Sequence, residues 1–147
     1  IIDIATLTSI YRPGPLTAKV DRLYIKAKNN PDDIDYGHPL IKEVLEETYG
    51  MIVFQEQIMK LCSVVAGFPE EETDTVRRSI MKRKASEAAE SLAKARAIKE
   101  RFVEGSVANG VDAQLADDLY EKILYFSGYG FNKAHAVSYA IDSYYCA

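Results

Sequence analysis

Residues 112–127 read DAQLADDLYEKILYFS, and their apolar side chains recur at the spacing of a helix. Four of them are separated by four, four and three positions: Leu115, Leu119, Ile123 and Phe126. Residues at these intervals share one face of an α-helix, whereas a half-buried strand would alternate apolar and polar side chains. Asp112 stands directly before the pattern, where a side chain that caps the first turn is favoured. The segment therefore predicts a capped amphipathic helix.

The same helical period recurs along most of the chain, and alternation with a period of two is scarce. Further helices are expected at residues 20–28, 39–49, 55–66, 69–84, 86–109 and 132–147. Pro13 and Pro15 flank Gly14, which predicts a rigid turn rather than a regular helix. The sequence thus predicts a mainly α fold, with six or seven helices in a single domain.

The overall composition is that of a globular domain. The chain has 147 residues, of which 48% are hydrophobic and 27% are charged. Eighteen Lys and Arg residues against 22 Asp and Glu residues give a net charge of −4. This balance excludes a generally basic nucleic-acid-binding surface, although it leaves room for a local basic patch. No apolar run approaches the length that crosses a bilayer, so no membrane association is expected.

The termini and the cysteines indicate the setting of the chain. The sequence begins at Ile1 rather than Met and stops inside a helical pattern, so we expect a piece of a longer protein. Cys62 and Cys146 lie far apart, among apolar or small neighbours and without a nearby His. Buried free thiols in a reducing cytoplasm are expected, rather than a disulfide or a zinc site.

A basic cluster is the first candidate functional site. Residues 77–84 carry five basic side chains and no acidic one, directly after four acidic side chains at residues 70–74. Acidic residues at the start of a helix and basic residues at its end complement the helix dipole, which explains part of this pattern. Five cations within eight positions repel one another unless an anion binds. The residues alone leave two interpretations open, a polyanion contact and a solvated helix end.

The second candidate site is the turn before the last expected helix, which reads GYGFNKAH over residues 128–135. Two glycines allow a ligand to approach the backbone, and the helix start offers N–H groups to an anion. Lys133 adds a positive charge and His135 a hydrogen-bond donor. Tyr129 and Phe131 offer flat faces for a base or a sugar. The alternative is a tight interhelix turn whose aromatic side chains pack in the core, and both interpretations remain open.

The other polar residues predict no catalytic centre. Arg12, beside the Pro-Gly-Pro turn, is placed to reach a phosphate or a neighbouring carboxylate. Glu46 and Glu47 are adjacent and face different sides of a helix, so they cannot share one metal ion. No Walker A loop occurs, and the chain offers groups that bind phosphate without the carboxylates that would hold a catalytic metal.

Five motifs then occur in one order along the chain. They are YRPGPL at 11–16, LEETYG at 45–50 followed by VFQEQ at 53–57, the pair Arg77-Arg78, FVEG at 102–105 and GYGFNKAHA at 128–136. This order and spacing resemble the bacterial C-family replicative DNA polymerases, the alpha subunits of DNA polymerase III. The resemblance covers essentially the whole chain. It implies the end of a palm domain or its junction at residues 1–16, and a helical fingers domain at residues 17–147.

The resemblance also implies roles for particular residues. The nucleotide-binding residues that it assigns are Arg77, Arg78, Lys82, Arg83, Tyr129, Asn132, Lys133 and His135. Of these, the double arginine and Lys133 would bind the triphosphate of the incoming nucleotide, with Lys82 and Arg83 as supporting charge. The remaining three, Tyr129, Asn132 and His135, would border the sugar and the nascent base pair. Arg12 would lie near the palm junction.

Three positions depart from the family's usual pattern. Met81 stands where a glycine is usual, Arg83 where a second lysine is expected, and Ala134 where a serine is common. A side chain at position 81 changes how closely the backbone can approach a ligand, and Ala134 removes a hydroxyl group. These departures concern individual nucleotide contacts rather than membership of the family.

The resemblance implies a DNA-directed DNA polymerase of the bacterial cytoplasm, associated with the nucleoid. Its partners would be template-primer DNA, deoxynucleoside triphosphates, the rest of the polymerase chain, the sliding clamp and other replisome subunits. Mg²⁺ would be held by palm aspartates upstream of Ile1, so we expect no metal site in this chain and no nucleotide incorporation by the chain alone. Two alternatives are a stand-alone helical nucleic-acid-binding module and a helical protein–protein interaction module.

Overall fold

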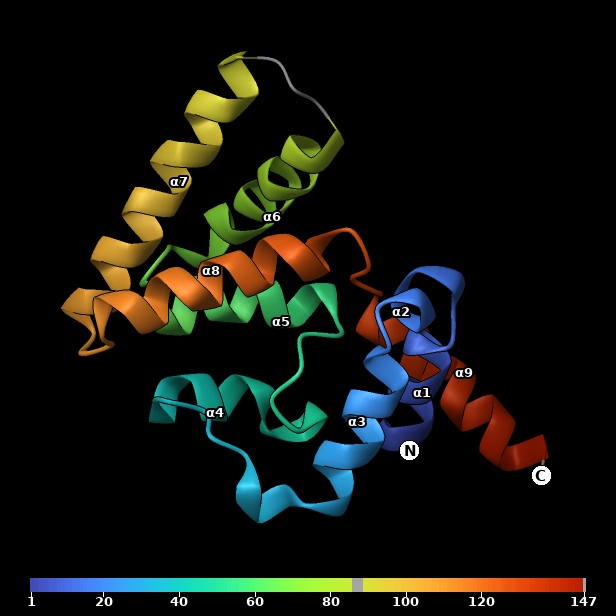
Figure 1. The fold of residues 1–147 in the computed structure, drawn as a ribbon. Helices are drawn as coiled ribbons and strands as arrows, with labels where there is room; N and C mark the ends of the chain where they lie inside the picture. The colour runs from blue at the N-terminus through green and yellow to red at the C-terminus, as the bar shows by residue number, and fades with distance from the viewer. Residues whose placement is uncertain (86–88, 147) are drawn as a thin grey trace.

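The computed structural model describes the backbone of residues 1–85 and 89–146, and the side chains of residues 1–80 and 92–146. Within these residues the chain folds into nine α-helices joined by short turns (Figure 1). The helices are α1 (Ile2–Ile10), α2 (Pro13–Thr17), α3 (Val20–Asn29), α4 (Pro39–Leu45), α5 (Gln55–Lys60), α6 (Glu70–Ala85), α7 (Ala89–Ala108), α8 (Ala113–Ser127) and α9 (Lys133–Cys146). Two 3₁₀ turns (Pro31–Asp33 and Glu46–Thr48) and one π turn (Leu61–Val65) complete the helical structure. The predicted mainly α fold is confirmed.

The predicted number of helices is too low, because two helices at the N-terminus were not expected. The Pro-Gly-Pro segment forms the short helix α2, so the prediction of a rigid turn without a helix is wrong. Pro13 and Pro15 both fall in the first turn of α2, where a backbone N–H has no helical partner to lose. The helix α1 lacks a clear amphipathic period, and the hydroxyl group of its Ser9 donates a hydrogen bond to the Ala5 carbonyl oxygen at 2.7 Å.

The larger lobe contains α4 to α8. In Figure 1, α6 and α7 form a hairpin that rises from α5 and α8, which lie side by side. The predicted cap of α8 is confirmed, since Asp112 Oδ1 accepts the backbone N–H groups of Gln114 (2.9 Å) and Leu115 (3.3 Å). Helix α7 approaches the π turn closely, and a Cβ atom added at Gly105 would lie 2.0 Å from the Ala66 carbonyl oxygen.

The smaller lobe contains α1, α3 and α9, and α9 packs against α1 (Figure 1). The Tyr24 ring is fully buried between them, and its hydroxyl group donates a hydrogen bond to Asp3 Oδ1 at 2.7 Å. Lys28 binds the other carboxylate oxygen at 2.6 Å. Phe126, near the end of α8, contacts the hydrophobic cores of both lobes. The segment that joins α8 to α9 is therefore the place where the two lobes meet.

The two cysteines differ in exposure. Cys62 is buried in the core of the larger lobe, as predicted. Cys146 is exposed, so the prediction of a buried thiol is wrong there. The reason is that the end of α9 extends beyond the core, as the exposed fractions of Tyr144 (63%) and Tyr145 (82%) show.

Candidate functional site

The turn between α8 and α9 is fixed by backbone pairing with the start of α5. Phe54 and Phe131 form an isolated parallel bridge, in which the Gln55 N–H donates to the Phe131 carbonyl oxygen at 2.9 Å. In return, the Phe131 N–H donates to the Val53 carbonyl oxygen at 3.1 Å. The Gln55 side chain also donates to the Gly130 carbonyl oxygen at 3.2 Å. Two segments about 75 residues apart in the sequence therefore form one rigid unit.

Arg12 holds the same turn from the other side. Its Nε donates to the Ser9 carbonyl oxygen at 2.7 Å, and its Nη2 donates to the Tyr129 carbonyl oxygen at 2.6 Å. The guanidinium carbon also lies 4.9 Å from the centre of the Phe131 ring, at cation–π distance. A Cβ atom at Gly14 would lie 2.5 Å from the Tyr129 ring, so glycine allows the ring to pack on α2. Arg12 thus anchors the turn to α1 and α2.

The first turn of α9 presents a positive charge that is balanced by carboxylates of the chain itself. The Lys133 ammonium group lies 2.7 Å from each carboxylate oxygen of Glu47. The Lys133 backbone N–H donates to Glu56 Oε2 at 2.9 Å. Asn132 Oδ1 accepts the His135 N–H at 2.8 Å and caps the helix. Carboxylate oxygens therefore occupy positions that suit an external anion, at a helix N-terminus beside a lysine.

An aromatic row continues from this turn along the exposed side of α9. The His135 ring lies 5.6 Å from the Phe131 ring and 4.6 Å from the Tyr139 ring, measured between ring centres. His135 is exposed, and Tyr139 retains 59% of its accessible surface. Flat, exposed rings at this spacing offer stacking surfaces for a nucleobase or a sugar.

The double arginine lies on α6 and shares one carboxylate. Arg77 Nε and Nη2 bind Asp74 Oδ1 at 3.1 and 2.6 Å, and Arg78 Nη2 binds Asp74 Oδ2 at 2.8 Å. The hydrogen bond from Arg77, helped by the charges of both arginines, holds the pKa of Asp74 below its usual value. The side chain of Arg77 is 14% exposed and that of Arg78 is 69% exposed. Arg78 is therefore the more accessible of the two to a ligand.

The structure brings some of the predicted residues together and separates others. Arg12, Tyr129, Asn132, Lys133 and His135 all belong to or contact the turn that begins α9. Helix α6 instead packs on α5, α7 and α8, so its double arginine belongs to the other lobe. The side chains of Lys82, Arg83 and the departing Met81 lie outside the described residues.

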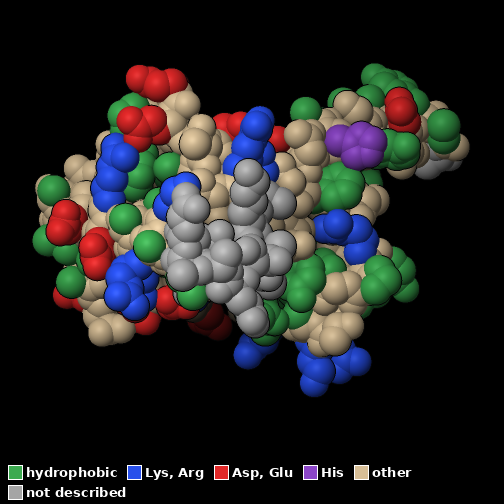
Figure 2. Space-filling view, turned by 90° about the horizontal axis from the view of Figure 1, so that it is seen from above, with side chains coloured by type: hydrophobic (Ala, Val, Ile, Leu, Met, Phe, Trp, Pro, Cys, Tyr) green, Lys and Arg blue, Asp and Glu red, His purple; other side chains and the backbone are tan. Residues whose placement is uncertain are grey.

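On the face shown in Figure 2, the described Lys and Arg side chains do not gather in one large patch. Figure 2 views the molecule from the tip of the α6–α7 hairpin and shows Lys and Arg side chains spread over this face, with acidic side chains between them. Such a distribution agrees with the net charge of −4. Among the described residues of this face, the distribution favours local contacts with phosphate groups over a continuous polyanion-binding surface.

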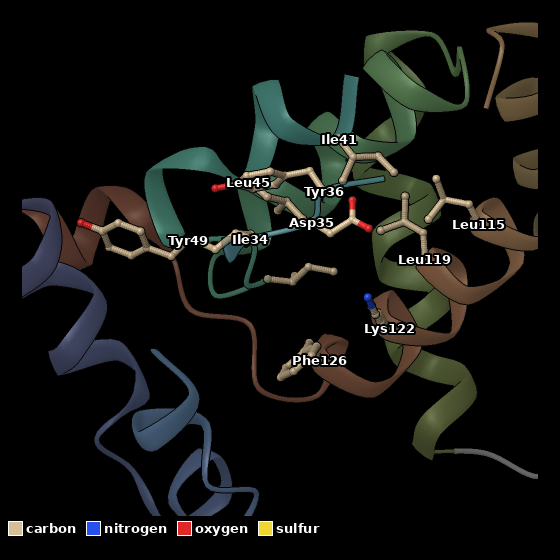
Figure 3. Close-up of a pocket in the computed structure, with 12 residues that line it drawn as sticks. Ile34, Asp35, Tyr36, Ile41, Leu45, Tyr49, Leu115, Leu119, Lys122 and Phe126 are labelled. Atoms are coloured by element: carbon tan, nitrogen blue, oxygen red, sulfur yellow. The ribbon is translucent and has the colours of Figure 1, made fainter. Parts of the chain in front are cut away.

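Two neighbouring cavities open beside this site, between α3, α4 and α8. Figure 3 shows the smaller of them, which has a volume of about 130 Å³ and is lined by residues of the 34–36 segment, α4 and α8. The larger has a volume of about 500 Å³ and also touches α3. Neither cavity is lined by a predicted nucleotide-binding residue, so the predicted site and the cavities are separate features.

The described part of the chain offers neither a cluster of metal ligands nor a membrane-spanning helix. No group of three or more His, Cys, Asp or Glu side chains is placed to hold a metal ion among the described residues. No helix in the described ranges is both long and apolar enough to span a membrane.

Glu47 and Glu56 were not predicted as members of the site. Their motifs, LEETYG and VFQEQ, stood out in the sequence, but nothing in the local pattern shows that either acid meets Lys133. The pairs are separated by 86 and 77 positions along the chain. Charge complementarity between a lysine at a helix start and an acid in a distant motif is the one available signal, and it does not select these two acids among 22.

Comparison with known proteins gives a consistent result. A family model for the finger domain of the bacterial DNA polymerase III alpha subunit matches residues 1–110. Proteins named DNA polymerase III subunit alpha are 39% identical to the chain over 145 residues in Aquifex aeolicus, 42% over 145 in Halalkalibacterium halodurans and 40% over 147 in Vibrio cholerae. The matches cover 97% to 99% of this chain. The chain itself spans 12% of the length of each relative.

Proposed function

Because the chain belongs to the family of finger domains of the bacterial DNA polymerase III alpha subunit, we propose that it binds an incoming deoxynucleoside triphosphate and template-primer DNA within a longer DNA-directed DNA polymerase. The residues proposed for the triphosphate are Arg77, Arg78 and Lys133, with Lys82 and Arg83 as supporting charge. Those proposed for the sugar and the nascent base pair are Tyr129, Asn132 and His135. Family membership is the premise, and the geometry of the α9 start supports the assignment.

The observation that carries this proposal is the combination of groups at the start of α9. A lysine ammonium group, a helix N-terminus and exposed aromatic rings lie together on a turn that is fixed by backbone hydrogen bonds. An anion gains from the first two, because the helix N-terminus and the lysine both carry positive charge. A base or sugar gains from the rings. A nucleotide carries both parts in one molecule.

Nucleotide binding at this place is an exchange of anions. Glu47 and Glu56 already satisfy the Lys133 ammonium group and backbone N–H. A triphosphate carries more negative charge than a carboxylate, so it competes for Lys133 in spite of Glu47. The turn itself stays in place, because Arg12 and Gln55 hold its carbonyl oxygens independently of either acid. We therefore assign Arg12 a positioning role at the junction of α1 and α2.

The double arginine divides into two roles. Arg77 is mostly buried and gives two hydrogen bonds to Asp74, so it fixes the carboxylate on the α6 surface. Arg78 is mostly exposed and makes one ion pair with the same carboxylate, which leaves other guanidinium N–H groups for a phosphate. Of the two arginines proposed for the triphosphate, Arg78 is therefore the one that contacts a phosphate directly, and Arg77 contributes by orienting Arg78 through Asp74.

The remaining expectations concern the whole polymerase. We propose that residues 1–16 form the junction with the palm and residues 17–147 the fingers. Mg²⁺ would be held by palm residues outside this chain, and the chain alone would not extend a primer. The other proposed partners are the rest of the polymerase chain, the sliding clamp and further replisome subunits. The proposed location is the bacterial cytoplasm, at the nucleoid.

The test uses the full-length polymerase that contains this chain, with the substitution Arg78→Ala. Loss of a charge-assisted phosphate contact of about 1.5–3 kcal/mol raises the KM for the nucleotide by a factor of roughly 10 to 150. The Kd for template-primer DNA should change much less. Arg22→Ala is the matched control, because Arg22 is also an exposed arginine but lies on α3. It should alter neither the KM for the nucleotide nor the Kd for DNA.

The two alternative functions give different results. Equal losses of nucleotide and DNA affinity in Arg78→Ala would contradict the triphosphate role and favour a nucleic-acid-binding module. For DNA binding that uses five phosphate contacts, the logarithm of affinity should fall with the logarithm of salt concentration with a slope of roughly −4. Affinity for DNA that does not depend on salt, together with an unchanged KM in Arg78→Ala, would favour a protein–protein interaction module.

A further inference from the structure

Helix α1 carries apolar side chains on two opposite faces. The buried side chains of its inner face are Ala5, Thr6, Ser9 and Ile10. The large apolar side chains that stay exposed on the other face are Ile1 (57%), Ile4 (36%), Leu7 (41%) and Tyr11 (75%). They follow one another at spacings of three, three and four positions, which place side chains on one face of a helix. These four residues are called the outer face of α1.

The polar groups of α1 are already paired within the chain. Asp3 is the one charged residue among positions 2–10, and Tyr24 and Lys28 of α3 bind its carboxylate. Thr8 is exposed beside the outer face, and its hydroxyl group donates a hydrogen bond to the Ala5 carbonyl oxygen at 2.9 Å. Covering Ile4, Leu7 and Thr8 would therefore leave no side-chain polar group of theirs without a partner, so their burial costs little.

This composition is typical of a helix that is covered on both sides. A helix at the surface of a globular protein usually turns an apolar stripe to the core and polar residues to water. Helix α8 follows that rule, since Asp118, Glu121 and Lys122 lie on its exposed side. Helix α1 departs from it, because its solvent-facing side is as apolar as its inner side. The outer face therefore indicates contact with a further apolar surface rather than with water.

Another part of the same polypeptide is the partner that suits the outer face. The chain spans 12% of the length of each relative, so a polymerase of that length has much surface that these 147 residues do not include. Parts of one polypeptide meet at a high effective concentration, and permanent interfaces have apolar, weakly charged cores. DNA suits the outer face less well, because its four residues include no Lys or Arg to bind phosphate groups.

We propose that the outer face of α1 is an interface with an apolar surface of the same polymerase chain, formed by residues outside these 147. This inference rests on the proposed function in one respect, namely that the chain works inside a longer polymerase. Arg12 directly follows α1 and holds the Tyr129 carbonyl oxygen at 2.6 Å. The interface therefore also positions the turn at the start of α9, which carries the proposed nucleotide site, relative to the rest of the polymerase.

The experiment is hydroxyl-radical footprinting of the full-length polymerase, without DNA and without nucleotide. Mass spectrometry measures the oxidation rate of Tyr11 in the folded polymerase and in the same polymerase unfolded in urea. Tyr11 is 75% exposed in the 147-residue chain, so without a covering partner it should react at close to the unfolded rate. If the outer face is an interface, Tyr11 should react several times more slowly in the folded polymerase.

A substitution tests the interface directly. Leu7→Lys places a charge in the outer face, and a lysine in the last turn of α1 suits the helix dipole, so the helix itself should persist. The oxidation rate of Tyr11 should rise several times, toward the unfolded rate. Val107→Lys is the matched control, because Val107 is 48% exposed and also lies in the last turn of its helix, α7. If circular dichroism shows that Leu7→Lys is unfolded, Leu7→Ala takes its place.

Three results would overturn the proposal. The first is a Tyr11 that reacts at close to the unfolded rate in the folded polymerase. The second is protection that appears only with DNA or only at high polymerase concentration, which would assign the outer face to DNA or to a second copy. The third is an equal effect of the Leu7 substitution and the Val107→Lys control. Failure of the nucleotide proposal looks different, since Arg78→Ala would then leave the KM unchanged while Tyr11 stays protected in the nucleotide-free polymerase.

Discussion

The pairing of Lys133 with Glu47 leads to a prediction in which stability and ligand affinity change in opposite directions. Glu47→Gln keeps the size of the side chain but removes its negative charge. The ammonium group of Lys133 lies 2.7 Å from both carboxylate oxygens, and the two side chains are 28% and 35% exposed. Ion pairs near the surface contribute about 0.2–1 kcal/mol, and this well-aligned pair belongs at the upper end. The substitution should therefore destabilise the chain by about 0.5–1 kcal/mol.

The same substitution should strengthen the binding of an external triphosphate. An anion that displaces Glu47 must overcome the energy of the existing pair, and removal of about 0.5–1 kcal/mol of competition lowers the Kd by a factor of roughly two to five. Isothermal titration calorimetry with inorganic tripolyphosphate measures this affinity, and urea unfolding measures the stability. If Glu47 only supported the fold, Glu47→Gln would lower the stability and would leave the affinity for tripolyphosphate unchanged or reduced.

Two matched variants complete the experiment. Glu46→Gln removes the neighbouring charge, which pairs with Lys42 at 3.6 Å, and should not change the Kd for tripolyphosphate. Lys133→Met removes the cation and should weaken binding severalfold. If Lys133→Met has no effect, the proposed triphosphate site itself is wrong. If Lys133→Met weakens binding but Glu47→Gln does not strengthen it, the exchange of anions is refuted while the site remains.

Three further predictions concern the fold. Gly105→Ala would place a Cβ atom 2.0 Å from the Ala66 carbonyl oxygen. The substitution should therefore lower the free energy of unfolding, measured by urea titration, by about 3 kcal/mol. A change below about 1 kcal/mol would contradict this close approach. A hydrogen bond from Lys28 holds the pKa of Asp3 below its usual value, so the ionised Asp3 carboxylate stabilises the fold at neutral pH. This stabilisation is lost as the pH falls through the lowered pKa. In Asp3→Asn, the free energy of unfolding should therefore fall less steeply as the pH is lowered into the acid range. Burial raises the pKa of Cys62 to about 12, so iodoacetamide at pH 8 should modify Cys146 alone in the folded chain, as mass spectrometry of the peptides would show.

Strong local signals in the sequence predicted the fold well. The α8 pattern and its Asp112 cap need only neighbours within one or two turns, and both are present in the structure. By contrast, α1 was missed because it mixes hydroxyl and apolar residues without an amphipathic period. Its helical state depends on packing against α9, which lies at the other end of the chain. Tertiary packing of this kind leaves no periodic signal in the segment itself.

The candidate site was predictable in composition but not in its pairings. The GYGFNKAH segment showed that a lysine, a histidine and aromatic rings stand on one turn. It did not show that Arg12 holds the Tyr129 carbonyl oxygen across 117 positions, or that Glu47 binds Lys133 across 86. The mechanism proposed from the sequence consequently lacked the carboxylates with which a nucleotide would have to compete at the proposed site. Such long-range pairs follow from the folded path of the chain.

The short segment from Glu46 to Gln57 organises the site more than the basic helix does. Gln57 is buried, accepts the Val53 N–H at 2.9 Å and donates to the Thr48 hydroxyl at 2.7 Å, so its amide ties the two ends of the segment together. Within this closed loop, Glu47 faces Lys133 while the residues at 49–50 line the cavity beside α8. The proposed anion site and the cavity thus share a wall only a few residues long. The buried hydrogen bonds of the Gln57 side-chain amide make that wall rigid. A shift of Glu47 away from Lys133 is therefore confined to the Glu47 side chain unless these hydrogen bonds also break.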